Sequence, residues 1–401
     1  MEGKTMNKKQ ILILLIVTNM VTISVVSLFF IFSNSQPKDG LTAQISDRDP
    51  NHVEQVQEKP KQTFHADVNS LIAQYDTVKS GRYQQAMEAY SKAIKAQPPY
   101  TAESSTQATY YANHGYNDKA IEVGEQDIQD TPDWPDRFYA LAWVYAKAGK
   151  YDKAIEVCQK TKQLHPEYPY IWHISAWINV KTGEPEKAIA DCNQALRLDP
   201  LSAKTNYAIG RIYGMLGRQQ EAIDAYKKAV ELKPDWADAY LFLGLTYAEL
   251  GNQDEAIKSY KEAIHFDKHY PEAHLFLGIA YDELGRCNKA IESFEQTIIE
   301  YYSPGNAERI HSLGIRPDLT NIYCAIGLCH LKLGQSYEAS VAFKQAIEID
   351  DNHAGAHYGL ALADLLLGDK KSALDECEAF KALKGEEAAK PLLDAISKAS
   401  Q

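Results

Sequence analysis

Residues 237–270 read ADAYLFLGLTYAELGNQDEAIKSYKEAIHFDKHY, and this stretch decides the fold. Positions 1–14 and positions 18–30 of the stretch each carry apolar residues at the three- and four-residue spacing of an amphipathic helix. Gly251 lies between them, and a glycine there is typical of a chain reversal after a helix. The stretch therefore predicts two helices joined by a tight turn, which is a helical hairpin.

The same pattern recurs along most of the chain with a period of 34 residues. Windows keep this register from 67 to 304, and two more follow after an insertion, 305–319; they begin at 67, 101, 135, 169, 203, 237, 271, 320 and 354. Alanine occupies the twentieth position of every window: Ala86, Ala120, Ala154, Ala188, Ala222, Ala256, Ala290, Ala339 and Ala373. A chance pattern would not hold its register through seven consecutive windows. The small residues at positions 8 and 20 predict a close approach of the two helices.

This pattern resembles the tetratricopeptide repeat, and the resemblance covers about four-fifths of the chain. It implies an all-α fold, a right-handed α-solenoid of nine helical hairpins, with units 1–7 over 67–304 and units 8–9 over 320–387. No hairpin of this kind buries its apolar face alone, so stacking supplies the core. Residues 388–401 predict a C-terminal capping helix and tail.

A single transmembrane helix is expected before the repeats. Residues 1–10 carry three lysines, and the uncharged residues of 11–33 form about 33 Å of helix, enough to cross a hydrocarbon core. Because the basic side precedes the span, the N-terminus is expected in the cytoplasm and the repeats on the periplasmic or cell-surface side of an inner or plasma membrane. A long signal sequence cleaved near Ser33, or a soluble chain with an unusual N-terminus, are the alternatives. Residues 34–66 are polar, contain three prolines and predict a disordered linker.

The composition argues against several functions. The net charge of −12 over 401 residues argues against nucleic-acid binding, because phosphates must be neutralised by basic groups. The sequence contains no nucleophile elbow, no phosphate-binding glycine loop and no zinc-binding HExxH helix. We therefore expect neither catalysis, nor a cofactor, nor a small-molecule substrate.

We expect the histidines and cysteines to have structural roles and not to bind metal or form disulfides. The histidines with metal-like spacing are expected to pack or to lie at the surface: His265, His269, His274, His353 and His357. Cys158, Cys192 and Cys377 share position 24, where other windows carry Tyr or Phe, and are expected to be small buried apolar residues. Cys324 and Cys329, five residues apart on one helix, are not expected to pair.

The candidate functional surface lies on the first helix of each hairpin. Positions 2, 5, 9, 12 and 13 lie opposite the hairpin seam, and in the resembling family this side lines a concave groove. Large residues gather there or at flanking position 6, and we predict that they bind a partner: Tyr139, Trp143, Tyr170, His173, Trp177, Tyr207, Arg211, Leu241, Phe242, Leu245, Leu275, Phe276 and Ile279. Tyr and Trp suit extended or helical segments of other proteins. The alternative is that large residues at positions 5 and 9 contact the neighbouring unit.

These observations predict a non-catalytic scaffold or adaptor of the cell envelope that binds other proteins. A substrate-recruiting subunit of a separate enzyme or of a secretion or assembly complex is an alternative, and a spacer without a specific ligand is another. The family's carboxylate-clamp residues are absent, since Lys204 and Arg211 are the nearest approach to that set. The insertion 305–319 predicts either a flexible break between two blocks or a binding loop.

Overall fold

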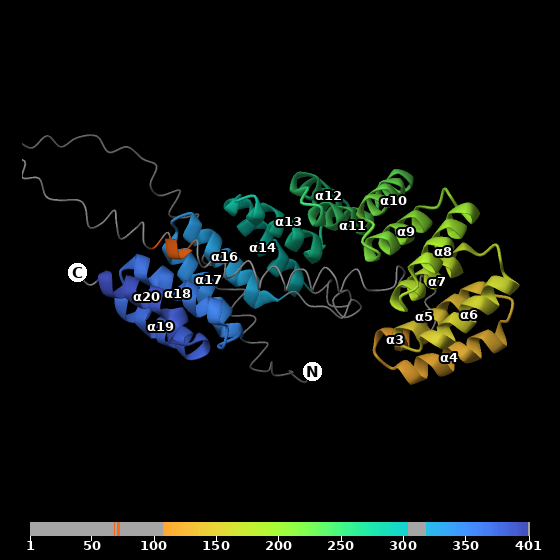
Figure 1. The fold of residues 1–401 in the computed structure, drawn as a ribbon, viewed down its shortest axis with the longest axis horizontal. Helices are drawn as coiled ribbons and strands as arrows, with labels where there is room; N and C mark the ends of the chain where they lie inside the picture. Colours follow the sequence, from red (N-terminus) through yellow and green to blue (C-terminus); the bar gives the residue numbers. More distant parts are fainter. Residues whose placement is uncertain (1–67, 69, 73–106, 304–317, 400–401) are drawn as a thin grey trace, which may run out of the picture. The chain divides into compact units, whose positions relative to one another are not determined.

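The computed structural model describes residues 68, 70–72, 107–303 and 318–399, and every regular element in these residues is α-helical (Figure 1). The predicted cytoplasmic segment, membrane anchor and linker lie outside the described residues, as do most of unit 1, residues 101–106 of unit 2 and nearly all of the insertion 305–319. None of the described helices combines the length and the hydropathy that a membrane span requires.

The described residues form helical hairpins, as predicted. We call the two helices of each hairpin its A helix and its B helix. The A helices are α3 (Gln107–Asn113), α5 (Pro135–Lys147), α7 (Pro169–Lys181), α9 (Ala203–Met215), α11 (Ala237–Glu249), α13 (Pro271–Glu283), α16 (Leu319–Lys332) and α18 (Ala354–Leu367). The B helices are α4 (Asn117–Asp130), α6 (Tyr151–Leu164), α8 (Pro185–Leu198), α10 (Gln219–Leu232), α12 (Gln253–Phe266), α14 (Cys287–Tyr302), α17 (Ser336–Ile349) and α19 (Lys370–Lys384).

The turns follow from the glycines between the two helices. Gly251, between α11 and α12, has a φ of 75°, a left-handed conformation that glycine adopts without steric cost. The next A helix often begins with proline, as at Pro169 and Pro271, whose missing N–H costs nothing in a first turn. Local sequence therefore sets both ends of each hairpin.

The two helices of a hairpin meet where the side chains are smallest. A Cβ built on Gly210 would lie 2.7 Å from Cδ1 of Tyr226, and one built on Gly244 would lie 2.5 Å from Cε1 of Tyr260. Both rings are almost completely buried. The predicted close approach at position 8 is confirmed, because the ring at position 24 occupies the space that a side chain would need.

Packing between hairpins completes the core. Each A helix packs on its own B helix, and each B helix packs on the next A helix. Neighbouring A helices also touch, as in the pairs α5–α7, α7–α9 and α16–α18. The last helix, α20 (Glu386–Lys398), packs on α19 through buried residues that include Leu392 and Ile396. The chain is thus a series of stacked helical hairpins with an additional helix at the C-terminal end.

Two glycines of α9 test the importance of the close approach. We expect Gly210→Ala to lower the free energy of unfolding by about 1–3 kcal/mol, because the new methyl group must displace the Tyr226 ring. Gly214→Ala is the matched control, since no atom lies within 4 Å of its built Cβ, and helix propensity predicts a gain of about 0.5–1 kcal/mol. Urea denaturation followed by circular dichroism measures both changes. Equal effects of the two substitutions would contradict the proposed packing.

Candidate functional site

The structure buries most of the residues predicted to bind a partner. Tyr170 and Ile279 are half-buried, and the other eleven are buried: Tyr139, Trp143, His173, Trp177, Tyr207, Arg211, Leu241, Phe242, Leu245, Leu275 and Phe276. The expectation that this surface faces solvent is therefore wrong for these eleven side chains. Their role in partner binding stays a prediction, and it has to be compatible with burial.

The cause of the burial is the packing of neighbouring A helices and hairpins. The Tyr207 ring lies 4.6 Å from the Trp236 ring and 5.7 Å from the Phe242 ring, measured between centroids. The Arg211 guanidinium lies 4.6 Å from the centroid of Phe242. These contacts join α9 to α11, so from Tyr207 onward the positions that were expected to form a groove contribute to the core.

The N-terminal part of the surface contains several buried polar atoms. The Tyr139 hydroxyl, the Trp143 Nε1 and the Trp177 Nε1 are closed to solvent and have no hydrogen-bond partner in the described part of the chain. Burial raises the pKa of Tyr139 far above its usual value, so the hydroxyl keeps its proton. An unsatisfied buried donor costs about 1–3 kcal/mol, and most buried polar groups in proteins avoid this cost. These three donors, which we call the donor row, therefore require an explanation beyond core packing.

A lysine accompanies each tryptophan of the donor row. Lys147 Nζ lies 4.8 Å from the ring centroid of Trp143, and Lys181 Nζ lies 5.5 Å from that of Trp177. The two pairs occupy equivalent positions in consecutive repeats. Lys147 is exposed and Lys181 is half-buried, so the pairs mark the solvent-facing edge of the donor row. Lys147 Nζ also donates to Asn113 Oδ1 at 2.8 Å. Asn113 occupies the same repeat position as Lys147 in the preceding unit.

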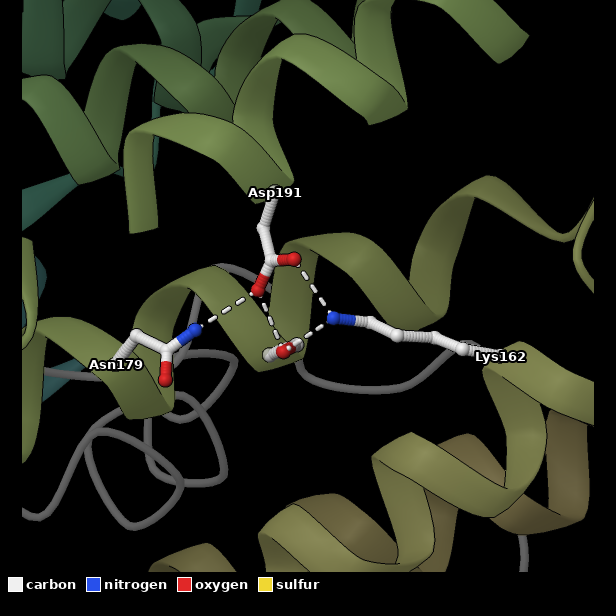
Figure 2. A network of polar contacts seen from close by, with 4 residues as sticks. Lys162, Asn179 and Asp191 are labelled. Carbon is white, nitrogen blue, oxygen red and sulfur yellow. Dashed lines mark hydrogen bonds and ion pairs between the residues drawn. The ribbon is translucent and has the colours of Figure 1, made fainter. Parts of the chain in front are cut away.

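A buried polar network joins the same hairpins (Figure 2). Asp191 Oδ1 accepts from Lys162 Nζ at 2.7 Å, while Asp191 Oδ2 accepts from Ser175 Oγ at 2.6 Å and from Asn179 Nδ2 at 2.9 Å. The residues come from α6, α7 and α8, and Lys162 Nζ lies 4.2 Å from the ring centroid of Trp172. The network satisfies its own donors and acceptors, which favours a structural role. The sequence analysis missed it, although Ser175 and Asn179 are polar residues at inward-facing positions.

The five histidines that were considered as metal ligands have separate surroundings. His269 Nδ1 lies 2.9 Å from Glu300 Oε2, and His357 Nδ1 lies 2.6 Å from Glu376 Oε2. His353 Nδ1 accepts from the Ala356 N–H and caps α18. His274 Nε2 lies 3.4 Å from the Lys268 carbonyl oxygen. The exposed His265 ring packs against Phe266. The packing and surface interpretation fits these contacts.

The cysteines occupy buried positions. Cys158, Cys192 and Cys377 are buried, as predicted, and burial raises the pKa of each thiol, to about 12, 12 and 11 respectively. A cluster that the sequence analysis missed brings together Asp282, Cys287 and Cys329, whose potential ligand atoms lie within 4.8 Å of one another. Lys332 Nζ lies 3.4 Å from Asp282 Oδ1 and Cys329 Sγ donates to the same oxygen at 3.4 Å. The carboxylate therefore already has protein partners.

Comparison with known protein families agrees with this geometry. A profile for the "TPR repeat" matches residues 210–251 and 244–285, and profiles for the "Tetratricopeptide repeat" match residues 78–100, 135–168, 169–200 and 320–353. No curated protein sequence is significantly similar to the chain.

Comparison with solved structures finds several chains that are similar to this one. The C-terminal part of a TPR repeat-containing protein from Cytophaga hutchinsonii has a TM-score of 0.50 and 20% identity, over 64% of this chain and 98% of that chain. MamA has a TM-score of 0.40 and 29% identity, over 47% of this chain and 95% of that chain. A chain of the APC/C hetero-tetramer Cut9–Hcn1 has a TM-score of 0.43 and 18% identity. The match covers 71% of this chain and 53% of that chain.

His173 makes stability depend on pH. Its ring is fully buried on α7, and burial lowers its pKa from 6.5 to about 3. Because the folded-state pKa is lowered, the unfolded chain binds the proton at a higher pH than the folded chain does. The stability that the neutral ring contributes is therefore complete above pH 6.5 and is lost as the pH falls toward 3. We expect the free energy of unfolding to fall by about 1.4 kcal/mol more between pH 7.5 and 5.5 in the wild type than in His173→Gln.

Urea denaturation at the two pH values measures this difference. Substitution of the exposed His265 by Gln serves as the control and should leave the pH dependence of the wild type unchanged. If His173→Gln keeps the full wild-type pH dependence, the ring is protonated equally in the folded and unfolded chains and the prediction is wrong.

Proposed function

The chain is a tetratricopeptide repeat protein, and from this premise we propose that it is a non-catalytic scaffold that binds partner polypeptides through the donor row and its two lysines. Proteins built from such repeats act as protein–protein interaction scaffolds. The single observation that carries the proposal for this chain is the set of three buried donors, Tyr139, Trp143 and Trp177, without acceptors.

A bound polypeptide supplies the missing acceptors. Backbone carbonyl oxygens of an extended segment accept from the hydroxyl and the two indole N–H groups, and carboxylates of the segment pair with Lys147 and Lys181. Each hydrogen bond that replaces an unsatisfied donor removes a cost that the free protein carries. Since the donors are closed to solvent, binding starts at the lysine edge and opens the covering contacts. The partner is therefore a segment rich in acceptors, with acidic residues at the lysines.

The scaffold is proposed to work at the cell envelope. The support is the charge pattern of the N-terminus, where three lysines in residues 1–10 precede an uncharged stretch within 11–33. This pattern favours a single-pass anchor with a cytoplasmic N-terminus and repeats outside the cytoplasm. The polar residues 34–66 then separate the repeats from the membrane surface.

Conservative substitutions test the donor row. The triple variant Tyr139→Phe, Trp143→Phe and Trp177→Phe keeps aromatic rings but removes every donor. We expect it to reduce cross-linked co-purification of partners from native membranes at least tenfold. Tyr139→Phe alone should change the free energy of unfolding by less than about 1 kcal/mol, or raise it, because the hydroxyl makes no bond in the described protein.

Trp134→Phe is the matched control, because Trp134 is 59% exposed and lies directly before α5. It should leave partner recovery unchanged. Undiminished recovery of every partner with a folded triple variant would refute the proposed site. A loss of more than about 2 kcal/mol in Tyr139→Phe would instead show that the hydroxyl is a structural group.

A topology reporter tests the location. An alkaline phosphatase domain, active only outside the cytoplasm, is joined after residue 66, and a second fusion is made after residue 10. We expect activity from the first fusion and none from the second, because the uncharged stretch separates the two points. A folded but inactive reporter in the first fusion would reverse the orientation, and recovery of this fusion in the soluble fraction would indicate a cleaved signal sequence.

A further inference from the structure

A short segment near the start of the repeats is buried in the core at the other end of the chain. Val68, Leu71 and Ile72 are 0%, 6% and 7% exposed, and they belong to the hydrophobic cluster formed by residues of α16 to α20. Figure 1 shows the segment, in orange, among these C-terminal helices. Residues 73–317 separate the two parts in sequence. The contact is therefore not one between consecutive repeats.

The segment has the pattern of one face of a helix. Its described residues are helical, and its three buried residues follow the i, i+3, i+4 spacing. Ser70, which lies between them in sequence, is exposed. A helix of this kind buries one apolar side and leaves the other in water, which is how an amphipathic helix binds a groove on another protein.

The receiving surface occupies the same repeat positions as the donor row but has different chemistry. In the last two units, positions 5, 9 and 12 belong to the cluster that contains the segment: Cys324, Leu328, Leu331, Tyr358, Leu362 and Leu365. None of these side chains carries a charge. Inward-facing residues of α16, including Ile326 and Cys329, belong instead to the neighbouring cluster of the central repeats. One face of α16 thus belongs to the core of the central repeats, and the other belongs to the cluster of the last hairpins that also contains the segment.

The C-terminal helices and the segment share one core. α16 and α18 pack on each other and on α17, and α18 also packs on α19. Leu328 and Leu362, on α16 and α18, are 0% exposed and belong to this core. Val68 belongs to the same cluster and comes from outside the C-terminal helices. The face of α16 and α18 is therefore part of a core to which a distant segment of the chain contributes.

We propose that the face of α16 and α18 is a binding site for a short amphipathic helix, and that residues 68–72 of the same chain are its resident ligand. This proposal goes beyond the scaffold function at the donor row and does not depend on it. The resident segment excludes partners with the same apolar spacing until it leaves. The site selects apolar side chains at i, i+3 and i+4 and gives no partner to a charge at those positions.

A peptide-binding experiment tests the proposal in the full-length chain. The probe is a fluorescent peptide with the sequence of residues 64–79, FHADVNSLIAQYDTVK. The triple variant Val68→Ser, Leu71→Ser and Ile72→Ser should bind the probe at least tenfold more tightly than the wild type, because its own segment no longer occupies the site. Ser70→Ala, at the exposed position of the segment, should bind the probe as weakly as the wild type.

Further measurements keep the result interpretable. A probe with Leu71 and Ile72 replaced by serine should not bind any form of the chain. Hydrogen exchange of α16 and α18 should rise in the triple variant and return to the wild-type level when the intact probe is added. Equal probe binding by the folded triple variant and the wild type would overturn the proposal. A wild-type dimer that the triple substitution converts to a monomer would also overturn it, because the ligand would then come from a second copy.

Discussion

The contact on which the hairpins from α9 to α17 depend is the one between an aromatic ring of a B helix and the bare backbone of the A helix that it covers. Gly210 and Gly244 leave no room for a side chain beside Tyr226 and Tyr260. Phe343 is enclosed in the same way by Gly327 and Gly359, from two successive A helices. Because a hairpin buries its apolar side only against its neighbours, these contacts fix both the hairpin and the register between hairpins. The register in turn decides which side of each A helix faces the next one.

Much of the fold could be predicted because its determinants are local and repeated. The hairpin predicted from residues 237–270 is observed as α11 (Ala237–Glu249) and α12 (Gln253–Phe266), within one residue of the expected boundaries at the turn. Glycine at the turn and alanine at the crossing point act within a single repeat, so their effect is visible in the sequence. The burial of Val68 among C-terminal helices was not predictable in this way. It depends on a contact between parts of the chain that no local pattern connects.

The candidate site was harder to predict for a related reason. A large residue such as Tyr207 at position 5 has the same sequence signature whether it lines a groove or packs on the next A helix. Whether the residue lines a groove or packs on its neighbour depends on the distance between neighbouring A helices. That distance cannot be derived from the sequence of one repeat. Polar residues at inward-facing positions, such as Ser175 and Asn179, are more informative, because a buried polar atom needs a specific partner. Two such residues four positions apart, as in Ser175 and Asn179, indicate a polar partner on the packed helix, which in this chain is Asp191.

Repeat positions 5 and 9 carry the donor row near one end of the described repeats and only apolar or weakly polar side chains near the other. At the first end, the unsatisfied indole groups of Trp143 and Trp177 require acceptors. At the second, the buried Leu328 and Leu362 share a hydrophobic cluster with Val68, Leu71 and Ile72. These two chemistries lie in different repeats, and one short ligand does not satisfy both. A chain of this construction is suited to holding two different polypeptide segments at once, which is the physical requirement for a scaffold.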